Sequence, residues 1–409
     1  MLRPSSAALL ALLPAVAAGA PYDGTQAFDA YSGVVVASGR VIGLGGAYVG
    51  VGEGVAGATV NPAAVAQRDR HNEDTWDLDG FLTWYLPQPE ELADLDLSND
   101  GVADADLSGS GIFLLGGSGQ VGRLGAGVVG QFWGVSSAMP AGDGVTIGKL
   151  DFSLAVGWSG WRDSLVLGAS VRNDTGAVSY TPPLGGTEQE ITYQTVALRL
   201  GALWRPRGQP FRLGMAWDPG GRAEPVGDRA AFPVTTPAAF EFPWVLSVGA
   251  SAWLGPNARR YNEPPPIALD RHPDWGPGPE LVTNARMPVL VSVQLDVAGP
   301  TPGAVSIESA LLAPGEAQLS GERASFAVKV GAEWEAWPRW VRVRGGGYLE
   351  PSRTGAGPRP HGTFGFEVRV PFWPWDLQVG ATGDVASLYQ NVSLSIGFWG
   401  DYGPMAPPG

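Results

Sequence analysis

The most regular feature of this chain is an alternation of apolar and polar residues with a period of two, the spacing of side chains on opposite faces of a β-strand. The apolar face of residues 150–158 consists of Leu150, Phe152, Leu154, Val156 and Trp158. The opposite face is polar or small and includes Asp151 and Ser153. The same alternation recurs in 196–204, 289–297, 326–336, 364–370 and 388–398, and no helical period of similar length competes with it.

The length of these runs indicates where the strands reside. The runs approach ten residues, which is about what a tilted strand needs to cross a bilayer, whereas strands of soluble proteins average about 5–6 residues. In hydrocarbon every backbone polar group must find a partner within the protein, so spanning strands must close on themselves. We therefore expect an all-β fold, a transmembrane antiparallel β-barrel whose apolar faces look outward at lipid and whose polar faces look inward.

Fifteen runs fit the pattern, although a bacterial single-chain barrel has an even number of strands. Either one run is not a strand, or a further strand lies within 218–240 or 254–285, and we expect about fourteen strands. The runs are 81–87, 111–117, 121–132, 147–158, 164–172, 190–204, 210–217, 241–253, 286–297, 303–311, 324–335, 339–349, 362–371, 375–383 and 389–399.

The connections between the runs differ in length, as expected when short turns lie at one end of a barrel and long loops at the other. Short turns are expected at 159–163, 205–209, 337–339 and 371–375, and long loops at 88–110, 133–146, 173–189, 218–240, 254–285 and 350–361. Tryptophan gathers at the short turns, as Trp158, Trp161, Trp204, Trp337, Trp340, Trp373 and Trp375. Indole rings prefer the boundary between hydrocarbon and water, which favours one ring of an aromatic girdle over ordinary core tryptophans.

The N-terminus and the charge balance limit the function classes. Residues 1–19 combine Arg3 with an apolar stretch and small residues, which predicts a secretory signal peptide cut after Ala18 or Gly19. No later apolar run is long enough for a transmembrane helix. The chain has a net charge of −14 and no cysteine, which excludes disulfides and argues against nucleic acid as a partner. We expect a plug-like segment at 20–78, the barrel at 79–399 and a tail at 400–409.

Residues 43–66, GLGGAYVGVGEGVAGATVNPAAVA, are too rich in Gly and Ala to bury a large core. A dinucleotide loop would need G-x-G-x-x-G spacing within a β-α-β unit, and both are missing. The run resembles the N-terminal signature of the outer-membrane long-chain fatty-acid transporter (FadL-type) superfamily, which includes PorV-type barrels. The matching residues are Gly45, Gly46, Ala47, Glu53, Asn61, Pro62 and Ala63, whereas Val60 stands where the family often has an aromatic residue.

This resemblance implies that the segment is a plug inside a barrel of about fourteen strands, with Gly45, Gly46, Asn61 and Pro62 setting its conformation. It implies an outer-membrane protein for the passive uptake of hydrophobic small molecules such as long-chain fatty acids. In the family, the ligand is held above the plug and released sideways through the wall.

The same motif also fits a PorV-type barrel that binds a secreted protein and acts in secretion or surface assembly. The partner is therefore either a hydrophobic small molecule or a protein, in addition to outer-membrane lipid, and no oligomeric state is predicted. A soluble secreted β-protein, in which the alternating faces are core and solvent, is a third interpretation.

One acidic segment is a candidate metal site. Asp96, Ser98, Asp100, Val102 and Asp104 have the spacing of ligands in a calcium-binding loop, with Gly101 where a sharp turn is needed. The twelfth position, where a bidentate acid belongs, is Leu107. The sequence therefore favours a solvated acidic loop, and Ca²⁺ is the one cofactor that it leaves open.

Catalytic motifs are weak. The three histidines, His71, His272 and His361, have no ligand-like spacing, and no G-x-S-x-G elbow occurs. A Ser-His-acid triad is assembled in space rather than in sequence, so the absence of an elbow does not exclude one. We nevertheless expect a protein that is not an enzyme.

Overall fold

The computed structural model describes residues 22–67, 76–86, 94, 96–103, 107–138, 143–161, 163–183, 186–256, 258–262, 289–308, 317–337, 340–372 and 375–399. The short helical elements are α1 (Gly39–Gly43), α2 (Gly54–Ala58), η1 (Pro62–Ala66), η4 (Arg229–Ala231) and η5 (Ala258–Asn262). The strands are β1 (Phe28–Asp29), β2 (Trp76–Tyr85), β3 (Leu107–Val121), β4 (Leu124–Ala138), β5 (Gly144–Gly160), β6 (Leu165–Thr181), β7 (Gln189–Trp204), β8 (Phe211–Asp218), β9 (Gly221–Val226), β10 (Phe240–Phe242), β11 (Val245–Leu254), β12 (Val289–Ala298), β13 (Ser325–Trp337), β14 (Val341–Glu350), β15 (Arg359–Phe372), β16 (Trp375–Ala386) and β17 (Tyr389–Trp399).

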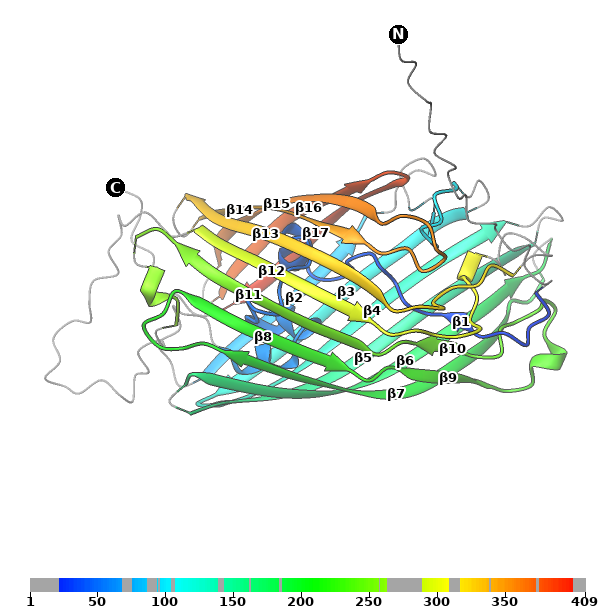
Figure 1. Ribbon diagram of the computed structural model, residues 1–409, viewed down its shortest axis with the longest axis horizontal. Helices are drawn as coiled ribbons and strands as arrows, with labels where there is room; N and C mark the ends of the chain where they lie inside the picture. Colours follow the sequence, from blue (N-terminus) through cyan, green and yellow to red (C-terminus); the bar gives the residue numbers. More distant parts are fainter. Residues whose placement is uncertain are drawn as a thin grey trace, which may run out of the picture.

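The wall is a closed antiparallel barrel (Figure 1). Neighbouring strands pair in chain order, and β17 pairs with β2 to close the ring. Strand β9 continues β8, β10 leads into β11, and β1 lies inside, so the wall has fourteen strands, as expected. The surplus predicted run is 303–311. Its residue Val305 forms only isolated bridges with Phe28 and Leu319, and 309–311 lie outside the described residues.

The outward apolar face is confirmed over the part of the wall that adjoins the short turns. On β5, Leu150, Phe152, Leu154, Val156 and Trp158 are 44–60% exposed, although burying such side chains is worth about 1.5–3 kcal/mol each. A continuous exposed apolar band of this size belongs in lipid. The predicted girdle residues Trp158, Trp161, Trp204 and Trp337 are exposed beside the short turns. Among the described residues, no helix is long and apolar enough to span a membrane.

Beyond the apolar band the strands continue, and the polarity of their faces reverses. At the start of β5, Val145 and Ile147 are buried inside, whereas Thr146 occupies the outer face. At the end of β6, Val178 is buried inside and Thr175 lies on the outer face. The prediction of loops at 133–146 and 173–189 is therefore wrong, because these residues are mostly strand whose apolar side faces the interior.

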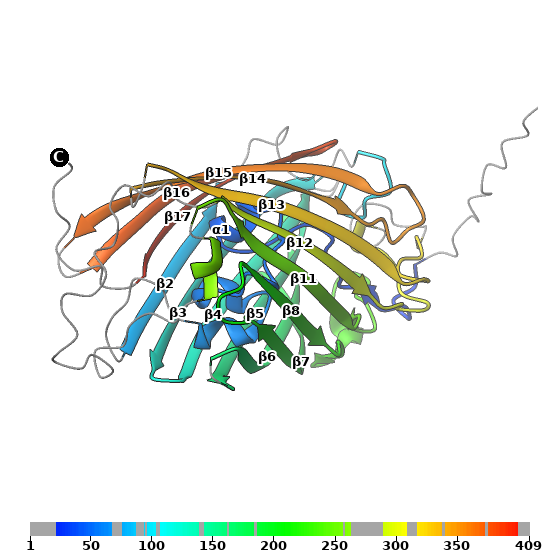
Figure 2. The same cartoon turned by 60° about the vertical axis from the view of Figure 1, so that its left-hand side comes forward.

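We call the end of the barrel with the connections 161–164, 205–210 and 338–340 the short-turn end, and the opposite end the long-loop end. Figure 2 brings the short-turn end forward. The predicted short turns at 159–163 and 205–209 overlap these connections. Residues 371–372 and 375 of another predicted turn belong to strands, and 338–339 and 373–374 lie outside the described residues. Two other connections break the expected pattern. The connection 255–288, which overlaps the predicted loop 254–285, starts and finishes at the short-turn end, and β16 and β17 are joined at the long-loop end by only 387–388. The length of a connection therefore does not show at which end of the barrel it lies, whereas the order of the strands does.

Candidate functional site: the lumen and its inner segment

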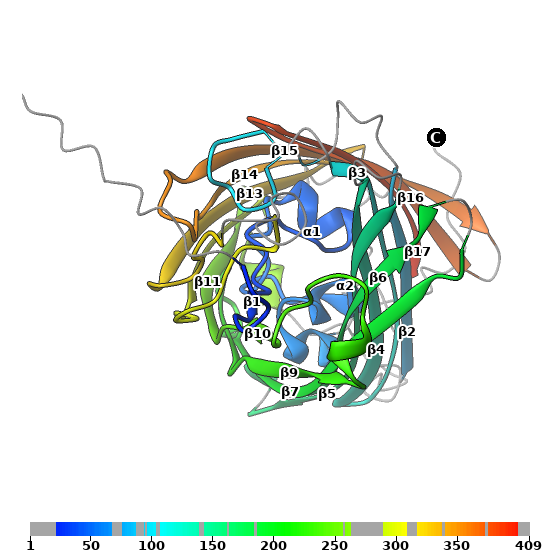
Figure 3. The same ribbon diagram turned by 90° about the vertical axis from the view of Figure 1, so that its right-hand side faces the viewer.

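Residues 28–67, which we call the inner segment, lie within the ring of strands. Figure 3 looks along the barrel from the long-loop end and shows α1 and α2 inside it. Most side chains of the inner segment are buried, and those of Val41, Tyr48, Val49 and Val55 are fully so. The lumen is therefore filled by chain near the short-turn end.

The inner segment rests directly on glycines of the wall. A Cβ added to Gly214 of β8 would lie 1.9 Å from the carbonyl oxygen of Val49, and one added to Gly168 of β6 would lie 2.3 Å from the amide nitrogen of Ala63. Wall residues in the same situation are Gly125, Gly157, Gly201, Gly249, Gly331 and Gly346. Glycine permits this close backbone approach, which accounts for part of the chain's high glycine content.

The four residues singled out in the sequence motif have identifiable contacts. Asn61 caps η1, because its Oδ1 accepts a hydrogen bond from the amide of Ala63 at 3.1 Å. Its Nδ2 donates to the carbonyl oxygens of Val49 and Ala202, both at 3.1 Å, so this one side chain ties the segment to itself and to β7. Pro62 begins η1, where a missing amide proton carries no penalty.

Gly45 and Gly46 have φ angles of +60° and +76°, which favour glycine. A Cβ on Gly45 would also lie 2.6 Å from the backbone nitrogen of Gly347. These two residues therefore meet both a conformational and a steric requirement where the inner segment passes β14.

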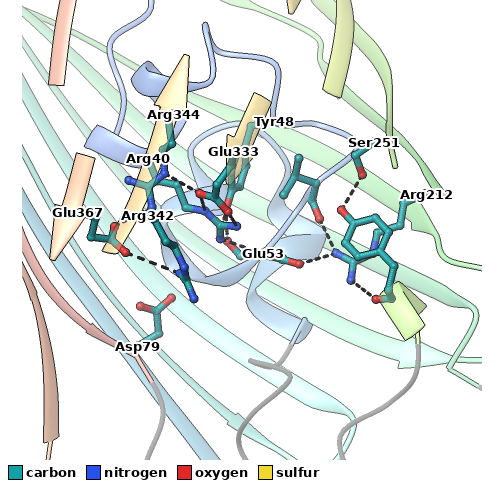
Figure 4. Close-up of polar contacts among 12 residues, drawn as sticks. Arg40, Tyr48, Glu53, Asp79, Arg212, Ser251, Glu333, Arg342, Arg344 and Glu367 are labelled. Carbon is teal, nitrogen blue, oxygen red and sulfur yellow. Dashed lines mark hydrogen bonds and ion pairs between the residues drawn. The ribbon is translucent and has the colours of Figure 1, made fainter. Parts of the chain in front are cut away.

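A network of ion pairs links the inner segment to two parts of the wall (Figure 4). On one side, Arg40 pairs with Glu333 of β13 at 2.8 Å, and Glu333 also holds Arg344 of β14. On the other side, Glu53 pairs with Arg212 of β8 at 2.8 Å. Arg40 and Glu53 pair with each other at 3.0 Å and complete the connection between β8 and β13, which are three strands apart along the wall. Removing one partner of such a buried pair costs about 3–5 kcal/mol, so the network fixes the segment in place.

The long-loop end holds a second buried cluster, which we call the outer cap. It consists of Phe28, Val135, Val145, Ile147, Val178, Ile191, Tyr193, Ala223, Phe240, Phe242, Val305 and Ala317. The cap joins the inward faces of the strand extensions to the start of the inner segment, and β1 pairs with β10 within it. This explains the reversed polarity of the extensions, since outside the bilayer an apolar face must be buried against protein.

Two cavities lie between the outer cap and the packed part of the inner segment. The outer cavity, of about 310 Å³, is lined by apolar side chains that include Ile112, Trp133, Ile147, Phe242 and Val245. The inner cavity has a volume of about 220 Å³. Val34, Val36, Thr59, Arg199 and Asp218 line both cavities and form the boundary between them.

The wall is interrupted beside this boundary. Strand β7 pairs with β8 over Leu200–Trp204 and with β9 over Thr192–Gln194, but residues 195–199, which are all described, have no register partner in either strand. The opposite edge bends at Pro219 and Gly220, and Pro243 interrupts the neighbouring strand between β10 and β11. Backbone groups at such a break are free of the ladder, so the wall is weakest where Arg199 and Asp218 face the cavities.

The predicted calcium loop forms a turn whose acidic groups are already used. Asp96 accepts hydrogen bonds from the amides of Asp100 and Gly101, at 2.8 and 3.0 Å, and Asp100 accepts from Val102 and Gln318. The amide of Ser98 donates to Glu308, and Asp104 lies outside the described residues. Within the described ranges, no group of three or more acidic or histidine side chains is arranged to hold a metal ion.

Sequence reasoning missed the charged residues that shape the lumen. Lys149, Asp151, Arg172, Arg199 and Asp218 line the outer cavity, and Arg40 of the inner segment pairs with Glu53, which the sequence motif had singled out. The positions of the strand residues on inward faces were visible as the polar half of the alternation. Their partners were not, because the paired residues are distant in sequence and depend on strand register.

The barrel resembles solved outer-membrane channels. A crystal structure of a Pseudomonas aeruginosa FadL homologue is 14% identical and matches with a TM-score of 0.50, covering 94% of this chain and all of that chain. The monoaromatic hydrocarbon channel CymD is 12% identical with a TM-score of 0.54, covering 91% of this chain and all of that chain. No family model and no curated protein matches the sequence. At these identities the similarity shows that the fold is that of a FadL-like barrel.

Proposed function

We propose that the protein is a passive channel for small hydrophobic molecules in the bacterial outer membrane. The observation that carries this proposal is the outer cavity, which is enclosed in the lumen between a cap and an inner segment that blocks straight passage. Ligand pockets typically measure about 300–1,000 Å³, and the outer cavity of about 310 Å³ has aromatic and aliphatic side chains in its lining beside charged ones. A wide aqueous pore would not be filled in this way.

The location follows from the outer surface. An apolar band with tryptophans beside the short turns suits a lipid bilayer, and closed barrels with such bands span outer membranes. The FadL homologue and the hydrocarbon channel CymD share this architecture, which supports the same setting for this chain.

The interrupted wall offers a route out of the lumen. The inner segment is packed against wall glycines and held by ion pairs, so downward exit would require it to be expelled. The break opposite residues 195–199 of β7 adjoins both cavities. We propose that a molecule enters through the outer cap and leaves sideways at this break, as the resemblance to the fatty-acid transporters implies. The proposed ligand class is small hydrophobic molecules, and an aromatic hydrocarbon and a long-chain fatty acid are two probes of it.

Uptake of radiolabelled toluene and palmitate tests the proposal. Gram-negative host cells without a channel of this type should take up at least one probe faster when they produce the protein. Val34→Trp should reduce this uptake, because Val34 lines both cavities and the indole would fill the boundary. Val102→Trp is the matched control, since Val102 is 61% exposed on a loop. Equal uptake with and without the protein, together with a stoichiometric protein partner after purification, would instead support a protein-binding barrel.

A further inference from the structure

We propose that the outer cavity accepts uncharged apolar molecules and rejects carboxylates, and that Asp218 determines this selectivity. The inference rests on the proposed function and specifies the ligand class of the same cavity. It follows from how the charges that face the cavity are paired.

Within the described residues, each cationic side chain lining the outer cavity has a carboxylate partner. Lys149 contacts Asp151 at 3.1 Å, and Arg353 contacts Asp29 at 2.5 Å. Arg172 and Arg199 share Asp218, at 2.5 and 3.0 Å. A ligand carboxylate would therefore find no cation available and would have to displace a carboxylate of the protein. Buried pairs resist such exchange because the displaced charge loses its compensation.

The charge balance of the lining also disfavours an anion. Lys149, Arg172, Arg199 and Arg353 face Asp29, Asp94, Asp151, Asp218 and Glu350, so acidic groups outnumber basic ones. The partners just behind the lining include one fixed charge of each sign, Arg359 beside Asp94 and Asp174 beside Arg172, together with His361 beside Glu350. A bound carboxylate would thus enter a site with an excess negative charge, and a low-dielectric interior strengthens that repulsion. An uncharged hydrocarbon has no such cost.

Asp218 is the residue on which this balance depends most. It ends β8, and its Oδ1 accepts a hydrogen bond from the amide of Gly220 at 3.0 Å. Its Oδ2 is therefore the oxygen that holds the guanidinium groups of both Arg172 and Arg199. Arg172 also contacts Asp174, whereas the only carboxylate contact of Arg199 among the described residues is Asp218. Since Arg199 and Asp218 line both cavities, a molecule that moves between them passes this pair.

The test compares uptake of radiolabelled dodecanoate and methyl dodecanoate at pH 7.5 in cells that produce the full-length protein. The two probes share a carbon chain and differ in charge. The wild type should take up the ester faster than the acid. Asp218→Asn preserves an acceptor for Gly220 but frees Arg199, so the ratio of acid to ester uptake should rise about tenfold, the effect of one charge-assisted hydrogen bond. The double variant Asp218→Asn with Arg199→Gln should return the ratio to that of the wild type.

Glu335→Gln is the matched control. The Glu335 side chain is 8% exposed, like that of Asp218, and pairs with Arg342, but it lines neither cavity. Its ratio should equal that of the wild type. Asp151→Asn, which frees Lys149 on the same cavity, is the second variant and should raise the ratio if Asp218→Asn fails to assemble.

The possible failures are distinguishable. If the wild type takes up dodecanoate as fast as its ester, or if neither assembled variant changes the ratio, the selectivity proposal is wrong while the channel function stands. If neither probe enters faster than in cells without the protein, the proposed function fails and the selectivity proposal falls with it.

Discussion

Replacing Gly214 with alanine should loosen the inner segment and open an aqueous leak through the barrel. The added Cβ would lie 1.9 Å from the carbonyl oxygen of Val49 and 2.8 Å from the Cα of Gly50. Cβ contacts under 3.0 Å essentially never occur, so the two backbones must separate by about 1.1 Å, the difference between 3.0 and 1.9 Å. Strand β8 is paired with β7 and β11 on its two edges, so the inner segment is the part that moves.

The cost can be worked from the contacts of Val49. Its carbonyl accepts a hydrogen bond from Asn61 Nδ2 at 3.1 Å, and its amide donates to Gln294 Oε1 at 2.8 Å. Overpacking a well-packed site costs about 1–3 kcal/mol, and each buried hydrogen bond contributes about 0.5–1.5 kcal/mol. Overpacking together with the loss of both bonds gives a destabilisation of about 2–6 kcal/mol.

Single-channel conductance in planar bilayers measures the leak, and thermal unfolding of the purified protein measures the lost stability. Gly117→Ala on β3 is the control, because its added Cβ has no contact closer than 3.9 Å. We expect frequent ion-conducting openings and a lower unfolding temperature for Gly214→Ala alone. If both variants conduct and unfold like the wild type, the inner segment does not close the lumen by resting on wall glycines.

Three further predictions address the lipid face, the ion-pair network and the outer loop. Leu154→Arg should destabilise the barrel in lipid by about 2–4 kcal/mol. Thr146→Arg, on the outer face of the strand extension, should be close to neutral. Heat-shift electrophoresis after refolding into vesicles compares the two variants, and equal stability would refute the placement of the bilayer. Glu53→Gln leaves Arg212 buried without its carboxylate, so the inner segment should lose about 3–5 kcal/mol of stabilisation. This loss should appear as increased conductance in planar bilayers. A variant that conducts no more than the wild type would contradict this prediction. Burial raises the pKa of Asp94 to about 7 from 3.8, against the opposing effect of Arg359. The protonated carboxyl of Asp94 therefore contributes its full stabilisation below about pH 3.8, and this contribution is lost as pH rises through about 7. Limited proteolysis of the loop at 94–103 should be slower at pH 5 than at pH 8, and Asp94→Asn should remove the difference; the same pH dependence in the variant would exclude Asp94 as the cause.

The period-two pattern predicted the barrel because lipid imposes one simple requirement. Side chains such as Leu154 and Phe366 must be apolar wherever the wall meets hydrocarbon, whatever they touch inside. This requirement holds over about ten residues of each strand, so the outward face and all but one of the strand runs could be identified from sequence alone.

The strand extensions could not be found in the same way. In β5 the apolar residues move from the outer face at Leu150 to the inner face at Ile147, while the strand itself continues. A search for one apolar face reads this reversal as the end of the strand. The false run 303–311 arose from the same limit, because Val305 is apolar through burial in the outer cap and not through contact with lipid.

The candidate site was only partly accessible from sequence. Gly45, Gly46, Asn61 and Pro62 stood out because their backbone requirements are local. The selectivity residues did not stand out, since Arg172 and Asp218 are 46 residues apart and meet only through strand pairing. Likewise, Arg40 and Glu333 are 293 residues apart and meet only because the inner segment folds back into the barrel.

The location of a bound hydrophobic molecule tests the central claim most directly. Crystals of the detergent-purified protein can be soaked with iodobenzene, whose iodine is located by anomalous scattering. The account predicts an iodine peak inside the lumen, in the outer cavity between Trp133, Ile147 and Phe242. Iodine found only on the lipid-facing surface beside residues such as Leu154, with the outer cavity empty at saturating iodobenzene, would contradict the account.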